Sequence, residues 1–444
     1  MSKTYHIQTY GCQMNVADSE LVESILIDQG YLNSNDPNNA DAIFINTCSI
    51  REHAEDKVHS QLGRYELIKK KRPNVIIGVL GCMAQSLKHD LLEKRSFVDI
   101  ILGPDSYRRL PVLLKRSKDQ PKSLVDTTLS RFEVYDDLFP SRKEGINAWI
   151  SIMRGCDKFC TFCIVPFTRG RERNRSIKSI IQEVKNAVKL GFVEITLLGQ
   201  NVNSYRTEYG SFPELLETVA KVRGVKRIRY TSPHPQDIDD LLLQVMRDNH
   251  NICNYIHLPL QSGDNRILKR MNRTYSREKY LDLVNRIRNY IPNCSITTDI
   301  IVGFPGETEE EFKATLDIMK KVNFDSAFMF KYSARPGTKA VEYSDQIRES
   351  VKQRRLESVI ELQKKITLIK NKMLIGKKVQ VLVEKESKKS SKQWAGRTDG
   401  NTWVIFNKTN ENIKDIVDVI INDAHGVTLF GNRLFKKEFA NEVN

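Results

Sequence analysis

The stretch Met153-Arg-Gly-Cys-Asp-Lys-Phe-Cys-Thr-Phe-Cys163 places three cysteines close together, directly after the short apolar run 148–153. A structural zinc site needs four ligands, and the next Cys or His along the chain is the distant His234. Zinc is therefore disfavoured. Cys thiolates also hold 4Fe-4S clusters, where three of them leave one iron open for a small molecule. Buried free cysteines or a disulfide are weaker alternatives, because apolar packing does not require three thiols at this spacing.

The composition describes a long, basic chain. Its 444 residues predict two or three domains. The 70 Lys and Arg residues outnumber the 55 Asp and Glu residues, for a net charge of +15, which favours a polyanionic partner. There is no run of 18 or more apolar residues and no apolar leader, so we expect a cytoplasmic protein without a membrane span. In such a chain, eight cysteines indicate metal or catalytic use.

In the first domain, expected at 1–120, three apolar runs that read as strands each lead to a cysteine and then to a helical pattern. These cysteines are Cys12, Cys48 and Cys82. The alternation predicts an open parallel α/β sheet, whose strands end at one ligand-binding crevice. We therefore expect the three thiols to converge as a second cluster site. For any one of them, a small residue at a tight turn is the alternative.

After a turn-rich linker at 121–141, residues 142–374 repeat a strand–helix pattern six times. The expected strands are 148–153, 193–198, 226–230, 255–260, 295–302 and 327–332. Repeated units of this kind predict a partial (β/α)6 barrel, with its chemistry on the loops that follow the strands.

The spacing Cys-x3-Cys-x2-Cys resembles that of the radical S-adenosylmethionine (SAM) enzymes. The resemblance implies that Cys156, Cys160 and Cys163 hold a 4Fe-4S cluster whose open iron binds and reduces SAM. Glycines in the loops after the strands let a backbone approach an adenosyl group, and polar side chains there can bind its amino acid end. The candidate SAM contacts are Gln200, Asn201, Ser232, Gln261 and Arg335. Cys253 and Cys294 precede strands and are expected to be core or surface thiols.

The last segment, 375–440, alternates short apolar runs with turn-rich pieces, which predicts a small β-barrel. It resembles the TRAM domain, an RNA-binding module. Basic residues follow the cysteine loop and also lie in the C-terminal segment. The candidate nucleic-acid contacts are Arg169, Arg171, Arg173 and Arg397. A solvated charged surface is the alternative for such runs.

Taken together, these motifs resemble the methylthiotransferases over almost the whole chain. The residues of the individual motifs resemble those of the MiaB type, which modifies dimethylallyladenosine in tRNA. The motifs that carry this are Thr9-Tyr-Gly-Cys-Gln-Met-Asn15, Asn46-Thr-Cys-Ser-Ile-Arg51, Ser60-Gln-Leu-Gly-Arg64, Ile164-Val-Pro-Phe-Thr-Arg-Gly-Arg171 and Gly396-Arg-Thr-Asp-Gly-Asn-Thr-Trp403. Thr402 departs from the Arg that this type commonly has there, which puts one RNA contact in doubt.

The resemblance implies methylthiolation of carbon-2 of N(6)-dimethylallyladenosine at position 37 of tRNA, next to the anticodon. It implies SAM, two 4Fe-4S clusters, an electron donor such as flavodoxin or ferredoxin, and a monomer. An inert aromatic carbon–hydrogen bond suits a cofactor-borne radical, and a single-stranded loop lets a protein splay bases. The alternatives are methylthiolation of threonylcarbamoyladenosine or of a ribosomal protein, and a non-catalytic iron–sulfur RNA-binding protein.

Overall fold

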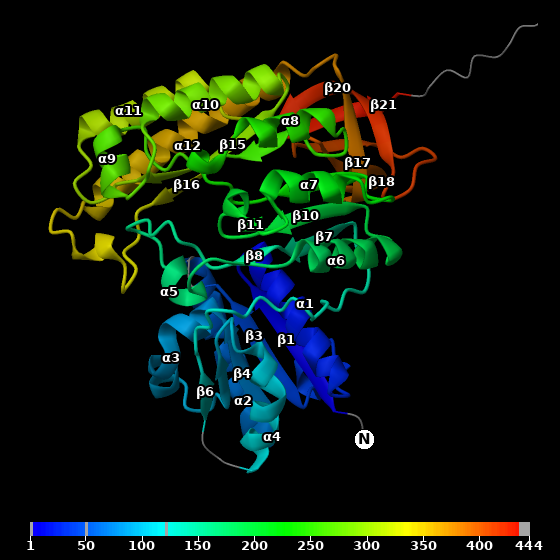
Figure 1. Ribbon diagram of the computed structural model, residues 1–444, viewed down its shortest axis with the longest axis vertical. Coiled ribbons are helices and arrows are strands. Elements are labelled where there is room, and N and C mark those ends of the chain that lie inside the picture. Colours follow the sequence, from blue (N-terminus) through cyan, green and yellow to red (C-terminus); the bar gives the residue numbers. More distant parts are fainter. Residues whose placement is uncertain (1–2, 49–51, 120–122, 435–444) are drawn as a thin grey trace, which may run out of the picture. The chain divides into compact units, whose positions relative to one another are not determined.

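The computed structural model describes residues 3–48, 52–119 and 123–434, and Figure 1 labels its elements. The chain forms two compact units. The first comprises Met1–Arg223, Tyr230–Ser232 and Ala334–Val341, and the second comprises Gly224–Arg229, Pro233–Ser333 and Glu342–Asn444.

The first unit begins with a six-stranded parallel sheet in the order β2-β1-β3-β4-β5-β6. Its strands are β1 (Thr4–Tyr10), β2 (Leu32–Asn33), β3 (Ala42–Thr47), β4 (Ile76–Gly81), β5 (Ile100–Leu102) and β6 (Leu124–Asp126). Every residue of β3 and β4 is buried. Continuous burial of this kind is typical of central strands that helices cover on both faces.

Four helices and two short 3-10 turns connect these strands (Figure 1). They are α1 (Gln13–Asp28), η1 (Pro37–Asn39), α2 (Glu52–Lys71), α3 (Cys82–Lys94), η2 (Tyr107–Arg109) and α4 (Leu110–Asp119). One core packs α1 and α4 against the sheet through residues such as Leu26 and Leu113. A second core packs α2 and α3 against it through residues such as Leu62 and Leu91. The predicted open α/β domain is therefore present.

The first unit continues with the cysteine loop and the first strand–helix repeats. Its elements are β7 (Asn147–Ser151), β8 (Met153–Arg154), α5 (Val165–Arg169), β9 (Arg173–Asn174), α6 (Ile177–Lys189), β10 (Glu194–Leu198), η3 (Val202–Ser204), β11 (Arg206–Thr207), β12 (Gly210–Ser211) and α7 (Phe212–Ala220). Strands β7 and β10 pair in parallel. Helix α6 begins where the Ser176 hydroxyl accepts a hydrogen bond from the Ser179 backbone N–H, a typical N-cap.

The residues of β13 (Arg227–Tyr230) belong to both units, and the later repeats lie in the second. These are η4 (Pro235–Asp237), α8 (Asp240–Asp248), β14 (Tyr255–His257), α9 (Asn265–Arg270), α10 (Arg277–Tyr290), β15 (Ser295–Val302), α11 (Glu309–Val322), β16 (Ser326–Lys331) and α12 (Glu349–Lys372). The turn η5 (Lys339–Glu342) lies between β16 and α12. Strands β14, β15 and β16 form a parallel sheet.

The second unit ends in a closed five-stranded barrel in the order β17-β18-β19-β21-β20. Its strands are β17 (Lys378–Ser387), β18 (Ser390–Thr398), β19 (Trp403–Asn407), β20 (Ile416–His425) and β21 (Thr428–Arg433). Alternate residues of these strands, among them Val381, Val404 and Leu429, fill the interior. Closure leaves the sheet without a free edge.

The α/β class, the parallel N-terminal sheet, the six strand–helix repeats and the C-terminal barrel are as predicted. One part of the expected linker differs, because Leu124–Asp126 forms β6 and pairs with β5. A three-residue edge strand among turn residues is too short for a periodic sequence signal. None of the helices within the described ranges combines the length and the apolar character that crossing a bilayer requires.

Candidate functional site

Cys12, Cys48 and Cys82 lie just beyond the carboxyl ends of three adjacent strands. Strands β1, β3 and β4 are parallel neighbours, and their register aligns the last residues of all three. Cys12 and Cys48 are close enough for their thiols to hydrogen-bond, and both Cys12 and Cys82 lie beside the Arg169 guanidinium. The structure thus brings the three thiols together.

Glycine precedes two of these cysteines for a steric reason. At Gly11, where φ is +124°, a Cβ atom would lie 2.6 Å from Cβ of Cys48. At Gly81, where φ is +88°, it would lie 2.3 Å from Oδ1 of Asn46. A side chain at either position would push the strand ends apart. The repeated Gly-Cys pair is therefore a packing requirement of the convergence.

The surroundings of Cys12 favour its thiolate. Cys12 is the N-cap of α1, and Cys82 is the first residue of α3. Helix N-termini stabilise thiolates. The Cys48 thiol, the Arg169 charge and the backbone N–H groups of Met14 and Asn15 lower the pKa of Cys12 to about 6, against the opposing effect of burial. Thiolate is the form that binds metal.

A buried amide network supports this edge of the sheet, and our sequence analysis missed it. The Asn15 side chain donates to Oδ1 of Asn46 at 3.0 Å. Asn46 donates in return to the Asn15 carbonyl and to the Ser19 hydroxyl, each at 3.0 Å. Asn15 and Asn46 are fully buried. They lie three residues after Cys12 and two before Cys48, so the motifs Gln13-Met-Asn15 and Asn46-Thr-Cys48 carried the signal.

Two arginines from the segment around the second cysteine loop converge on Asp18 of α1. Arg169 donates to Oδ2 of Asp18 at 2.8 Å, and Arg154 donates to Oδ1 at 2.5 Å. All three side chains are almost completely buried. Burial alone would raise the pKa of Asp18, but the two guanidinium charges hold it below its usual value. This cluster ties the N-terminal sheet to the cysteine loop.

The loop that carries Cys156, Cys160 and Cys163 is folded by its own backbone. The Cys156 N–H donates to the Gly170 carbonyl at 3.2 Å, and the Cys163 N–H donates to the Cys160 carbonyl at 2.9 Å. The three cysteines are partly exposed. Burial and the neighbouring Cys160 raise the pKa of Cys156 to about 11. A bound cation would offset that penalty, because metal coordination deprotonates a thiol.

Loops after the strands surround this cysteine loop within the first unit. A Cβ atom at Gly199 would lie 2.5 Å from Cγ of Met153, so the loop after β10 packs directly against β8. The Thr231 N–H donates to the Leu197 carbonyl, which places the loop with Ser232 beside the end of β10. The Ala340 N–H donates to the Thr161 carbonyl at 2.9 Å, which brings the 334–341 segment to the cysteine loop.

Four of the five predicted SAM contacts lie in these loops, namely Gln200, Asn201, Ser232 and Arg335. The fifth, Gln261, belongs to the second unit. Ser232 and Gln261 have left-handed backbones, with φ of 58° and 69°. Strain of this kind in residues other than glycine is typical of functional loops. Oε1 of Gln200 and Oε1 of Gln261 are buried and accept no hydrogen bond from any residue that the structure describes. Each oxygen is thus available to a ligand.

Glu172 is a further polar residue near this loop that the sequence did not single out. It accepts a hydrogen bond from the Ser204 hydroxyl at 2.7 Å and lies close enough to Cys156 to influence the charge of that thiol. Burial raises its own pKa. Glu172 directly follows Arg171, and the basic residues on both sides of it drew attention away from it.

The structure corrects the predicted RNA role of two arginines. Arg169 and Arg173 are buried. Arg169 is bound to Asp18, and Arg173 makes two hydrogen bonds to Asp105 at 2.8 and 3.0 Å. Neither guanidinium is exposed to a phosphate group. Arg171, in contrast, is 67% exposed, pairs with Asp157 at 2.9 Å and lies over the Phe159 ring.

One more predicted RNA contact, Arg397, is engaged inside the second unit. Arg397 donates to Oε1 of Glu384 at 2.6 Å and to Oδ1 of Asn401 at 2.9 Å, and its side chain is mostly buried. Arg227 and Arg229, from the basic run 221–229, are buried and donate to backbone carbonyls of the C-terminal barrel. These arginines hold the barrel together and in place, which corrects the assignment of Arg397 to RNA.

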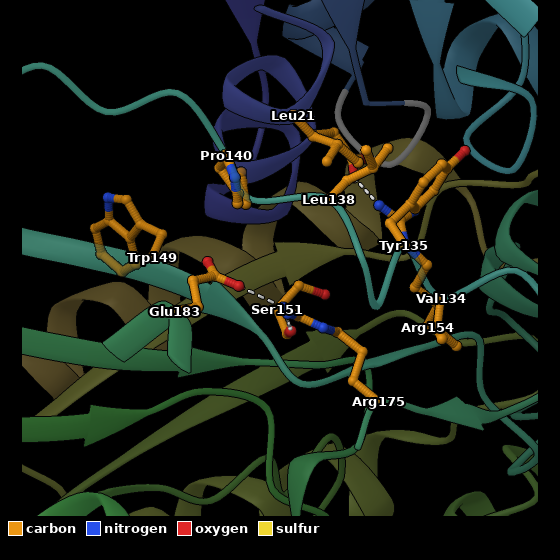
Figure 2. Close-up of a pocket in the computed structure, with 12 residues that line it drawn as sticks. Leu21, Val134, Tyr135, Leu138, Pro140, Trp149, Ser151, Arg154, Arg175 and Glu183 are labelled. Carbon is orange, nitrogen blue, oxygen red and sulfur yellow. Dashed lines mark hydrogen bonds and ion pairs between the residues drawn. The ribbon is translucent and has the colours of Figure 1, made fainter. Parts of the chain in front are cut away.

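A small pocket behind the cysteine loop is lined by charged residues (Figure 2). Arg175 donates to Oε2 of Glu183 at 2.6 Å and to the Ser151 carbonyl at 2.8 Å, and Arg154 and Trp149 also line it. Its volume is about 20 Å³, which holds about one water molecule. The pocket is therefore a seam of buried ion pairs and not a ligand site.

The two cysteine sets fit clusters better than single ions. Among the described residues, no three Cys, His, Asp or Glu side chains gather as tightly as one metal ion requires. A 4Fe-4S cluster instead takes each thiolate on a different iron. Cys253 and Cys294, by comparison, are buried singly, and burial raises the pKa of Cys294 to about 12. They are core thiols, as predicted.

Comparison with protein families matches three consecutive parts of the chain. Residues 150–319 match the Radical SAM superfamily, residues 4–103 match the Uncharacterized protein family UPF0004, and residues 372–434 match the TRAM domain. The matched regions coincide with the barrel repeats, the N-terminal sheet and the closed C-terminal barrel. The chain is thus a radical SAM protein with a TRAM domain.

Curated relatives define the family more narrowly. A tRNA-2-methylthio-N(6)-dimethylallyladenosine synthase of Parabacteroides distasonis is 48% identical over 96% of this chain and 94% of its own length. Synthases of the same name from Bacteroides fragilis and Porphyromonas gingivalis are 47% and 48% identical over 98% and 96% of this chain, and over 96% and 94% of their own lengths. The chain belongs to the family of tRNA-2-methylthio-N(6)-dimethylallyladenosine synthases.

Solved structures share the fold at low sequence identity. The radical S-adenosylmethionine methyltransferase TsrM from Kitasatospora setae, solved with cobalamin and a 4Fe-4S cluster, has a TM-score of 0.58 and 14% identity, with 77% of each chain covered. The cobalamin-dependent SAM radical enzyme OxsB has a TM-score of 0.55 and 13% identity over 82% of this chain and 56% of its own. At such identity these similarities concern the fold alone.

Proposed function

We propose that this protein adds a methylthio group to carbon-2 of N(6)-dimethylallyladenosine at position 37 of tRNA. The observation that carries the proposal is the pair of three-cysteine sets within one compact unit of a chain that is 48% identical to synthases of this name. Methylthiolation has two tasks, delivery of sulfur and activation of an inert carbon. Two separate sets of thiolates can divide them.

The enzyme uses SAM and two 4Fe-4S clusters. We assign Cys156, Cys160 and Cys163 to one cluster and Cys12, Cys48 and Cys82 to the other. A cluster held by Cys156, Cys160 and Cys163 would supply the electron that reduces SAM, and one held by Cys12, Cys48 and Cys82 would supply the sulfur. The chain's own residues hold and orient these groups. Gln200 offers a buried oxygen to SAM, and Asn201, Ser232, Gln261 and Arg335 are the further candidate contacts.

The tRNA contact nearest to the chemistry is Arg171. Its exposed guanidinium follows the cysteine loop, pairs with the exposed Asp157 and lies over the Phe159 ring. An exposed ion pair contributes little free energy, about 0–1 kcal/mol. Arg171 can therefore exchange Asp157 for a phosphate of the anticodon arm at small cost. The C-terminal barrel, which matches the TRAM domain, supplies a second contact with the RNA.

The remaining partners follow from the chemistry. Reduction of SAM needs an external one-electron donor, such as flavodoxin or ferredoxin. We further propose that the chain acts as a monomer in the cytoplasm, where its tRNA substrate is found.

Mass analysis of tRNA nucleosides tests the function directly. Cells that lack the gene should lose the 2-methylthio group and retain N(6)-dimethylallyladenosine, and expression of this chain should restore the group. Restoration of methylthiolation on threonylcarbamoyladenosine or on a ribosomal protein instead would identify one of the alternative substrates. Purified protein that cannot cleave SAM to 5'-deoxyadenosine would point to a non-catalytic RNA-binding role.

A further inference from the structure

Arg169 connects the two cysteine sets through the short segment on which it stands. Helix α5 begins two residues after Cys163 and ends at Arg169. The Arg169 side chain lies beside Cys12 and Cys82, while the carbonyl of the next residue, Gly170, accepts the hydrogen bond from the Cys156 N–H. Adjacent residues thus contact both sites.

The guanidinium of Arg169 is fixed in place. Nη2 of Arg169 donates a hydrogen bond to Asp18 at 2.8 Å. The backbone carbonyl of Arg169 accepts a hydrogen bond from Nη2 of Arg173 at 2.9 Å. Nη1 of Arg169 is buried, and no residue in the described ranges accepts a hydrogen bond from it. A buried donor without an acceptor costs free energy, so this nitrogen can donate to a group held at the cysteines, beside the Cys82 thiol that Arg169 already reaches.

The charges of this cluster do not cancel. Asp18 carries one negative charge, while Arg154 and Arg169 carry two positive charges, and all three side chains are at most 4% exposed. One buried positive charge remains, and it lies beside Cys12 and Cys82. Charges interact strongly at short range in such a dry environment.

We propose that Arg169 is a positioning residue that raises the reduction potential of the cluster held by Cys12, Cys48 and Cys82, and that Asp18 moderates this effect. The inference rests on the proposed second cluster. Reduction adds one negative charge to a cluster, so a nearby fixed positive charge stabilises the reduced form. Net charge and hydrogen bonds to sulfur are established determinants of cluster potentials.

Redox titration followed by electron paramagnetic resonance tests the proposal. The full chain would carry Cys156, Cys160 and Cys163→Ala, so that only the N-terminal cluster is observed. In this background Arg169→Gln should shift the oxidised-to-reduced ratio at least tenfold towards the oxidised form, a fall of about 59 mV for a one-electron couple. Arg169→Lys, which keeps the charge, should restore most of the potential.

Asp18→Asn should shift the same ratio in the opposite direction, because it removes the neighbouring negative charge. Opposite signs cannot come from general loosening of the fold. Arg175→Gln is the matched control, since Arg175 is an equally buried arginine on the same segment that pairs with Glu183. The cluster in this control variant should have the same reduction potential as the cluster in the background protein.

An unchanged potential in Arg169→Gln, or an equal shift in Arg175→Gln, would overturn the proposal while leaving the second cluster intact. If Arg169→Gln does not retain iron, the other two variants test the proposal. Asp18→Asn should then raise the potential and Arg169→Lys should keep most of it, and a lower potential in Asp18→Asn would overturn the proposal. A background protein that binds no iron would instead refute the second cluster, and the proposal with it.

Discussion

The four arginines at 169, 171, 173 and 175 show how position decides the role of one residue type. Three of them are buried and bind Asp18, Asp105 and Glu183, whereas Arg171 faces solvent. Sequence could mark the run but not this division. Asp18 lies 151 residues from Arg169 and 136 from Arg154, and no local pattern reports a partner at that distance.

Arg171→Gln should weaken tRNA binding. Each arginine that neutralises a phosphate contributes about 0.7 to 0.9 to the slope of log affinity against log salt concentration, so the slope should fall by about that amount. SAM cleavage without tRNA should be retained. Binding titrations at several salt concentrations measure this. Lys189→Gln, which removes an exposed charge at the end of α6, is the control. If Arg171→Gln has the same affinity and salt slope as this control, Arg171 is a solvated surface residue and does not contact the RNA.

Cys160→Ala should abolish the cleavage of SAM. Its loop would retain two thiolates, which are too few to hold a 4Fe-4S cluster that keeps one iron open. The measurement is 5'-deoxyadenosine formed by anaerobic protein with a chemical reductant. Cys253→Ala, at a buried thiol in the second unit, is the control and should remain active. Cleavage that survives in the Cys160 variant would contradict the radical SAM role of the loop.

Among the elements, strands and helices with a clear period were predictable, and so was the position of each cysteine at a strand end. The Gly-Cys pairs could be recognised as strand ends because the steric need for glycine is local. The sequence did not reveal the ion pairs that connect helices to loops. Glu307, just before α11, is an example: it accepts a hydrogen bond from the Gly303 N–H at 2.7 Å and from Arg355 of α12 at 2.8 Å.

The ion pair of Glu307 and Arg355 makes a pH-dependent contribution to the stability of the fold. Burial raises the pKa of Glu307 to about 7, against the opposing charge of Arg355. The folded state therefore binds more protons than the unfolded state between that value and the ordinary glutamate pKa of 4.5, and stability rises as the pH falls through this window. From pH 8 to 6 the wild-type protein should gain about 1 kcal/mol relative to Glu307→Gln, which cannot titrate.

Thermal unfolding of the two proteins at both pH values measures the difference. Other titrating groups are common to both and cancel. Parallel pH dependence in the wild-type protein and the Gln variant would show that Glu307 stays ionised in the folded state.

At the scale of the whole molecule, the two cysteine sets predict the metal content. Anaerobically reconstituted protein should contain about eight iron atoms and about eight sulfide ions per chain. Replacing Cys12, Cys48 and Cys82 together by Ala should halve both values and abolish the methylthio product while SAM cleavage continues. Loss of SAM cleavage in that folded variant would show that the two sites do not work separately.

The C-terminal barrel is held to the rest of its unit by two arginines of the basic run 221–229. Arg227 donates to the Arg397 and Gln380 carbonyls, and Arg229 donates to the Asp399 and Thr398 carbonyls, at 2.5 to 3.1 Å. Replacing both arginines by Gln should loosen the barrel. Limited proteolysis should then release the segment after Gly376 faster than in Lys221→Gln, a change at an exposed residue. Equal release rates would contradict this anchoring role.

The seam of buried ion pairs also bears on how such a chain can evolve. Asp18, Glu20 and Asp105 of the N-terminal sheet domain neutralise Arg154, Arg142 and Arg173 of the segment that follows. A radical SAM core that lost or exchanged its N-terminal domain would retain arginines evolved for carboxylates it no longer meets, and a buried pair broken on one side costs about 3–5 kcal/mol. We therefore expect the two parts to be inherited as one block, so that gene fusions and domain exchanges in this lineage join the chain outside residues 18–183.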